Sequence, residues 1–99
     1  MNQQALIKKM RQLQNEMLAT QKEIDETEFT STCGPVTVVM YGTKNVKLVK
    51  IDEDFTVQDA DDKELLEDSI LAAMNQLSNE INDFTEEKMS KYRAFTGGF

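Results

Sequence analysis

The segment EFTSTCGPVTVVMYGTKNVKLVKI, residues 28–51, decides the fold because it separates two long runs with helical spacing. It is rich in β-branched residues, and its apolar side chains tend to recur at every second position, which is typical of strands. Gly34-Pro35 and the run from Gly42 to Asn45 carry turn chemistry between the apolar pieces. We therefore predict three short antiparallel strands, within residues 29–32, 36–41 and 46–51.

Residues 3–26, which precede the strands, predict one amphipathic helix. Apolar residues recur there at steps of four and three, so they share one stripe along the helix. The stripe consists of Leu6, Met10, Leu13, Met17 and Ile24, with Thr20 in its one gap. We expect at least part of it to pack on the chain's own sheet. At 1.5 Å per residue, this helix would be about 36 Å long.

An acidic loop over residues 52–60 leads from the last strand into a second predicted helix. Asp61 and Glu64 have the spacing of a capping box, and the helix is expected to continue to about Arg93. Its apolar stripe again follows steps of three and four, and consists of Leu66, Ile70, Ala73, Leu77, Ile81 and Phe84. The helix would be about 45 Å long. Residues 95–99 are expected to form a frayed tail.

This order of elements predicts a single α+β domain over residues 1–99, an α-β-β-β-α protomer with a three-stranded antiparallel sheet and two long helices. Both helices exceed the width of about 26 Å expected for a compact domain of a hundred residues. They must therefore project from the core or pair with another chain, and we expect a homodimer. Val38 and Val49 should each face a core, so a charge at either should disturb folding or assembly.

The composition limits the classes of function. The chain has no His and no glycine-rich phosphate loop, so we expect no enzymatic activity, no cofactor and no small-molecule substrate. Cys33 is the one cysteine, and it fits a reducing, cytoplasmic location better than a reactive site. Asp52, Asp54 and Thr56 lack the glycine and the register of a calcium loop. No apolar window is long enough to predict a membrane span or a signal peptide.

The net charge of −7 argues at first against a nucleic-acid partner, but the acidity is concentrated in one block. Residues 52–68 carry nine acidic and one basic side chain, whereas residues 1–51 carry seven basic and five acidic ones. Antiparallel helices would bring the start of the first and the end of the second together, far from that block. The basic residues expected there are the candidate DNA-binding residues Lys8, Lys9, Arg11, Lys88, Lys91 and Arg93.

Three features of the sequence have alternative interpretations. Lys and Arg are also common on the solvated face of any amphipathic helix. Tyr92 and Phe95 could stack on unpaired bases, or they could simply belong to a frayed terminus. The acidic block could dock a basic partner, which would make the protein an interaction adaptor without direct DNA binding.

Residues 61–89, DDKELLEDSILAAMNQLSNEINDFTEEKM, resemble the helical signature of the YbaB/EbfC family in their LED, AA-x-N and EKM elements. The strand and turn pattern from Val36 through Gly42 to Asp52 is similar as well, so the resemblance covers nearly the whole chain. It implies a bacterial nucleoid-associated protein, located in the cytoplasm at the nucleoid. It also implies a tweezer-like homodimer whose projecting helices bind duplex DNA, largely through the DNA backbone. The chain differs from many members in lacking a Pro-rich ending.

Overall fold

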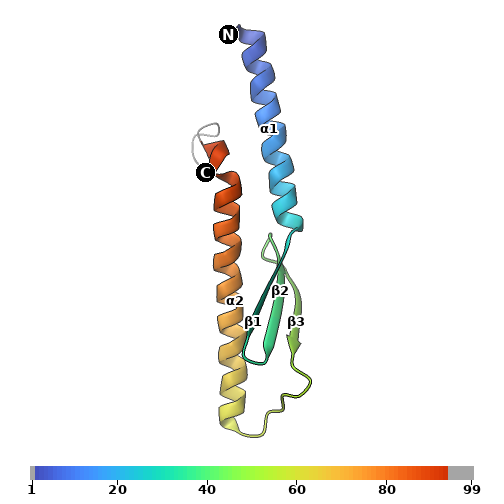
Figure 1. The fold of residues 1–99 in the computed structure, drawn as a ribbon, viewed down its shortest axis with the longest axis vertical. Helices are drawn as coiled ribbons and strands as arrows, with labels where there is room; N and C mark the ends of the chain where they lie inside the picture. The colour runs from blue at the N-terminus through green and yellow to red at the C-terminus, as the bar shows by residue number, and fades with distance from the viewer. Residues whose placement is uncertain (1, 94–99) are drawn as a thin grey trace.

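The predicted order of elements is confirmed by the computed structural model, which describes residues 2–93 (Figure 1). The elements are α1 (Gln3–Glu26), β1 (Glu28–Cys33), β2 (Val36–Tyr41), β3 (Val46–Ile51), α2 (Ala60–Met89) and a short 3₁₀ helix, η1 (Ser90–Tyr92). The molecule is elongated, with extents of 72 × 20 × 13 Å. Its radius of gyration of 19.8 Å exceeds the value of about 13 Å for a compact chain of this length. The helices therefore do project.

The strands form one antiparallel sheet in the order β1-β2-β3. Gly34 turns the chain between β1 and β2 with a φ of +53°, a conformation that suits glycine. Gly42 follows β2 and lies against the end of α1, where a Cβ atom would be only 1.8 Å from the carbonyl oxygen of Ile24. This close approach brings the β2–β3 turn next to α1.

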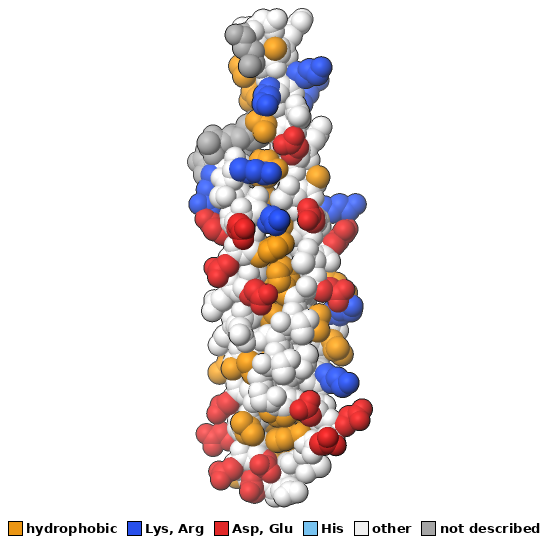
Figure 2. All heavy atoms as spheres, viewed as in Figure 1, with side chains coloured by type: hydrophobic (Ala, Val, Ile, Leu, Met, Phe, Trp, Pro, Cys, Tyr) orange, Lys and Arg blue, Asp and Glu red, His pale blue; other side chains and the backbone are white. Residues whose placement is uncertain are grey.

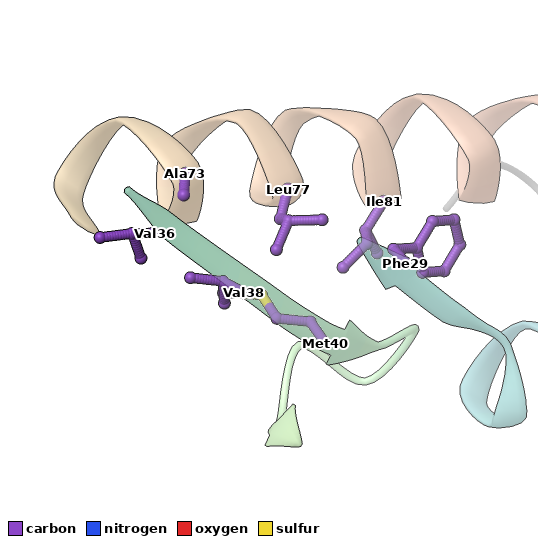
Figure 3. Close-up of a cluster of buried hydrophobic side chains, with 7 residues drawn as sticks. All are labelled: Phe29, Val36, Val38, Met40, Ala73, Leu77 and Ile81. Carbon is purple, nitrogen blue, oxygen red and sulfur yellow. The ribbon is translucent and has the colours of Figure 1, made fainter. Parts of the chain in front are cut away.

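The main core lies between α2 and one face of β1 and β2 (Figures 1 and 3). Burial alternates along β2, as expected for a strand with one covered face. The phenyl rings of Phe29 and Phe84 meet edge to face, with their centroids 5.2 Å apart. The buried side chains shown in Figure 3 are Phe29, Val36, Val38, Met40, Ala73, Leu77 and Ile81.

Strand β3 carries apolar side chains that stay exposed, since none of the elements within residues 2–93 buries them. Directly opposed residues of antiparallel strands point to the same face of a sheet. Val49 pairs with Val38, yet Val49 is 43% exposed whereas Val38 is fully buried, because α2 packs on β1 and β2. The expectation that each valine faces a core is therefore confirmed for Val38 and wrong for Val49 within the protomer. Val46 and Ile51 share this exposed position, opposite Met40 and Val36.

A second, smaller core joins the two helices near the end of α2. Ile24 of α1 is buried there with Met89 and Tyr92, and Met17 packs against them. The hydroxyl groups of Thr20 and Tyr92 are 3.3 Å apart, within hydrogen-bond distance. The end of α2 therefore contacts the carboxyl half of α1, and the amino half of α1 extends beyond it (Figure 1).

The cap of α2 differs from the predicted one. Asp59 is the N-cap, and its carboxylate accepts a hydrogen bond from the backbone N–H of Asp62 (2.8 Å). The Asp62 carboxylate in turn accepts from the backbone N–H of Gln58 (3.0 Å). The prediction of a capping box at Asp61 and Glu64 was therefore two residues late. The other end also differs, since α2 gives way to η1 before the predicted end of the helix.

Candidate nucleic-acid interface

The projecting half of α1 carries an isolated group of positive charges. Lys8, Lys9 and Arg11 are all exposed, and none forms an ion pair within residues 2–93. They lie nine to twelve residues before Thr20, which places them about 14 to 18 Å beyond the contact between Thr20 and Tyr92. No acidic residue precedes Glu16, and the amino terminus of a helix is itself partly positive. This part of the molecule should therefore attract anions.

The three basic residues predicted near the end of α2 lie toward the same end of the molecule, but closer to the sheet than Lys8, Lys9 and Arg11 (Figure 1). Arg93 forms an ion pair with Glu86, which reduces its availability for another anion. Cation–π contacts hold the other two, with the Lys88 ammonium 5.4 Å from the ring centroid of Phe84 and the Lys91 ammonium 5.2 Å from that of Tyr92. The six predicted residues thus form an upper group on α1 and a lower group at the end of α2.

Lys22, in the carboxyl half of α1, is a further basic residue that the sequence pattern did not single out. Its side chain is exposed and forms no ion pair among the described residues. Lys8, Arg11, Asn15 and Lys22 follow one another at steps of three, four and seven, so they share a face of α1. This face points away from the apolar stripe. The same spacing argument that identified the apolar stripe would have identified this polar one.

Tyr92 is not available to stack on nucleic-acid bases. It is only 2% exposed, since its ring is part of the small core between the helices. The stacking interpretation is therefore wrong for Tyr92. Phe95, the other residue considered for stacking, lies outside the described residues.

The opposite end of the molecule is acidic, as the red side chains at the lower end of Figure 2 show. The acidic block of residues 52–68 occupies the loop after β3 and the first turns of α2. Its carboxylates take part in none of the ion pairs found in residues 2–93, which join Lys47 to Glu28 and Arg93 to Glu86. The molecule is therefore electrically polarised along its length.

The ion pair on the sheet lies apart from both ends. Lys47 donates to the Glu28 carboxylate at 2.6 Å, and this hydrogen bond, together with the negative charge of Glu28, raises the pKa of Lys47 above its ordinary value of 10.5. Lys47 therefore stays charged at neutral pH with its own counterion beside it. Such a lysine is a weaker candidate for binding DNA than the lysines of α1, which form no ion pair within residues 2–93.

Other kinds of site have little support in the described part of the chain. Among residues 2–93, no three His, Cys, Asp or Glu side chains are grouped to hold a metal ion. None of the helices described there has the length and hydropathy needed to cross a membrane. An open groove of about 560 Å³ lies between α1, the β2–β3 turn and α2, and it is lined by both acidic and basic residues, including Asp25, Lys44 and Glu86.

The fold and the charge distribution define a class of protein, namely a small elongated α+β protein with a projecting basic helix at one end and an acidic surface at the other. The chain belongs to the YbaB/EbfC DNA-binding family, whose model matches residues 1–97. This confirms the resemblance seen in the sequence.

Similar proteins agree with this assignment. A protein of Clostridium novyi that is named a nucleoid-associated protein is 38% identical over 100 residues, covering 99% of this chain and 83% of its own. One of the same name from Agathobacter rectalis is 35% identical over 99 residues, covering 98% and 86%. The crystal structure of an uncharacterized protein from Helicobacter pylori matches with a TM-score of 0.68 at 19% identity, covering 88% of this chain and 91% of that one. That last match supports the fold.

Proposed function

We propose that this protein is a nucleoid-associated protein that binds duplex DNA as a homodimer. The observation that carries the proposal is the projecting half of α1, which presents Lys8, Lys9 and Arg11 without any acidic neighbour before Glu16. Membership of a DNA-binding family and the names of the relatives support the same function. A location at the nucleoid follows from it.

The chemistry of this end favours contacts with the DNA backbone. Lysine and arginine bind phosphates by charge, and glutamine side chains can donate hydrogen bonds to phosphate oxygens. Gln12 and Gln14 lie between the cations of α1 and Glu16, and both are exposed. Backbone contacts of this kind position a protein on DNA without reading its sequence. We therefore expect weak sequence preference, with the lower basic group at the end of α2 adding to the attraction.

The proposed dimer would form through β3. This strand lies at an edge of the sheet. Its exposed apolar residues are on the same face of the sheet as α2, which covers that face over β1 and β2 but not over β3. They are Val46, Val49 and Ile51. An exposed apolar edge strand is a favourable surface for pairing with another chain. A second copy placed there would cover these valines and the isoleucine while leaving the basic part of each α1 free to project.

Fluorescence anisotropy of a labelled duplex, titrated with matched single substitutions, tests the proposal. Arg11→Glu reverses a charge on the projecting half of α1, and Lys63→Glu makes the same kind of change in the acidic block, where the side chain is also exposed. The two variants carry the same net charge, because each changes the value of −7 by two units. We expect Arg11→Glu to weaken duplex binding by about tenfold, which corresponds to a loss of about 1.4 kcal/mol. Lys63→Glu should have little effect.

Equal losses from both variants would indicate only a general effect of net charge. If neither variant, nor the wild-type protein, binds duplex at low salt, the DNA-binding proposal is wrong. The acidic block would then favour the alternative function, an adaptor that docks a basic protein partner.

A further inference from the structure

The projecting half of α1 exposes more apolar surface than the proposed phosphate contacts require. Leu6, Ile7 and Met10 are 50%, 50% and 47% exposed. Further along the helix, Met17 and Ile24 pack against the end of α2. Contacts with phosphates use cations and hydrogen-bond donors, so DNA binding does not account for the three exposed apolar residues.

These residues form one sector of the helix, and cations border it on both sides. Successive residues of an α-helix are turned by about 100°, so Leu6, Met10 and Ile7 lie within an arc of about 100°. Lys9 lies beyond one edge of this arc and Arg11 beyond the other, each within about 60° of the nearest apolar residue. This arrangement is typical of amphipathic helices that bind the surface of an anionic membrane.

The charge of this end of the molecule suits an anionic surface. Residues 2–15 contain three basic and no acidic side chains, and the amino terminus of the helix is itself partly positive. Lysine and arginine can lay their methylene stems along an apolar surface while their charged groups stay in water. Anionic headgroups attract basic side chains at short range. Charge and apolar surface therefore favour the same kind of partner.

We propose that the projecting half of α1 binds the surface of an anionic phospholipid bilayer. Leu6, Ile7 and Met10 enter the boundary between the headgroups and the acyl chains. Lys9 and Arg11 contact the phosphates of the headgroups on either side of them. Binding of this kind places a helix in the surface of the bilayer and does not need a helix long enough to cross it.

The shape of the molecule determines how it can approach such a surface. Met17 and Ile24 continue the line of Leu6 and Met10 along α1, and α2 packs on them, so α2 lies on the apolar side of α1 (Figure 1). The molecule therefore meets the bilayer tilted, with the amino end of α1 foremost. The acidic block is then at the far end of a molecule 72 Å long, many Debye lengths from the anionic surface.

Lipid and DNA are alternative partners for this end of the protein. Lys9 and Arg11 cannot contact a lipid headgroup and a DNA phosphate at the same time. The inference nevertheless goes beyond the proposed function, because it depends on Leu6, Ile7 and Met10, which DNA binding does not use.

Sedimentation of the full chain with phospholipid vesicles tests the proposal. Vesicles that contain phosphatidylglycerol and phosphatidylcholine are compared with vesicles of phosphatidylcholine alone. We expect binding to the anionic vesicles to be stronger by about tenfold, because their surface potential attracts basic side chains. Equal binding to the two kinds of vesicle, or no binding to the anionic ones, would overturn the proposal.

Leu6→Gln combined with Met10→Gln separates the apolar contact from the charge. This pair leaves the net charge unchanged, and Leu, Met and Gln have similar helix propensities. Binding to anionic vesicles should fall by about tenfold, since two apolar side chains no longer enter the bilayer. The matched control is Leu65→Gln combined with Leu71→Gln, which changes residues of α2 that are 48% and 61% exposed. We expect no effect from the control pair, and an equal loss from it would overturn the proposal.

Titration of labelled duplex with the same variants keeps this test apart from that of DNA binding. The variant at Leu6 and Met10 should bind duplex like the wild-type protein. If the wild-type protein binds anionic vesicles as expected but binds no duplex, the lipid proposal stands and the DNA-binding proposal is wrong. Equal loss of vesicle and duplex binding in this variant would indicate a general disturbance of the projecting helix, and it would overturn the lipid proposal.

Ultracentrifugation without lipid tests the other possible occupant of this face, a second copy of the chain. The variant at Leu6 and Met10 should sediment like the wild-type protein. Dissociation of a dimer by this pair would show that a second copy covers the apolar arc, and it would overturn the proposal.

Discussion

Val38 and Val49 are paired across β2 and β3, yet burial makes them different targets for substitution. Val38 is enclosed by the core under α2, so Val38→Glu should lower the free energy of unfolding by several kcal/mol. Val49 is exposed in the protomer, so Val49→Glu should leave the protomer folded and dissociate the proposed dimer. Urea denaturation and analytical ultracentrifugation measure the two effects. Unfolding of both variants alike would contradict the assignment of Val49 to an interface between protomers.

The cap of α2 provides a second prediction for single residues. Asp59→Ala should lower the free energy of unfolding by about 1 kcal/mol, because it removes the acceptor for the Asp62 N–H. Asp61→Ala should cost less, since Asp61 lies within the first turn and does not provide the cap. Urea denaturation of the two variants gives the comparison. A larger loss from Asp61→Ala would support the cap predicted from the sequence instead.

The same region shows why this cap could not be predicted from the sequence. Asp59 and Asp62 have the same three-residue spacing as Asp61 and Glu64, and all four are acceptable in the first turn of a helix. The backbone becomes helical at Ala60, which selects the earlier pair. Sequence spacing offered two registers, and only the path of the loop distinguishes them.

At the level of the elements, the sequence predicted the helices and strands well because their apolar spacing is regular. The alternation in β2 identified both its strand character and its buried face. The exposure of β3 could not be predicted in this way, because its apolar residues resemble those of a buried strand. Coverage depends instead on the path of α2, which packs on β1 and β2. Antiparallel helices were predicted to bring the start of α1 and the end of α2 together. The structure does not bear this out, because the end of α2 meets α1 at Thr20 and Ile24, and the basic residues of α1 lie beyond it.

The two helices should contribute unequally to DNA binding. Lys8→Ala combined with Arg11→Ala removes two charges of α1 that form no ion pair within residues 2–93. This pair should weaken duplex binding by about tenfold, or about 1.4 kcal/mol. Lys88→Ala combined with Arg93→Ala removes the same charge from the end of α2 and should cost less, because Arg93 is already paired with Glu86. Anisotropy titrations at one salt concentration compare the two pairs. A greater loss from the pair on α2 would place the main contact on the lower basic group.

At the level of the whole molecule, polarity and length act together. The acidic block and the projecting half of α1 lie at opposite ends of a molecule 72 Å long. This distance is several times the Debye length of about 8 Å at physiological ionic strength. Salt therefore screens the charges of each end from those of the other, and neither end cancels the field around the other. A phosphate backbone should therefore be repelled by the acidic end and approached by the basic end. A dimer formed through β3 would keep this polarity in each protomer.

This polarity leads to a prediction about the salt dependence of binding. If the proposed dimer neutralises about four phosphates, the logarithm of its affinity should fall with the logarithm of salt concentration at a slope of about −3.6. Lys9→Glu combined with Arg11→Glu should weaken binding and flatten the slope, with dimerisation unchanged in the ultracentrifuge. Glu53→Gln combined with Asp54→Asn should leave the slope nearly unchanged, because these residues lie in the acidic block. Since the slope counts released counterions, an unchanged slope in the lysine and arginine variant would mean that α1 does not touch the phosphates.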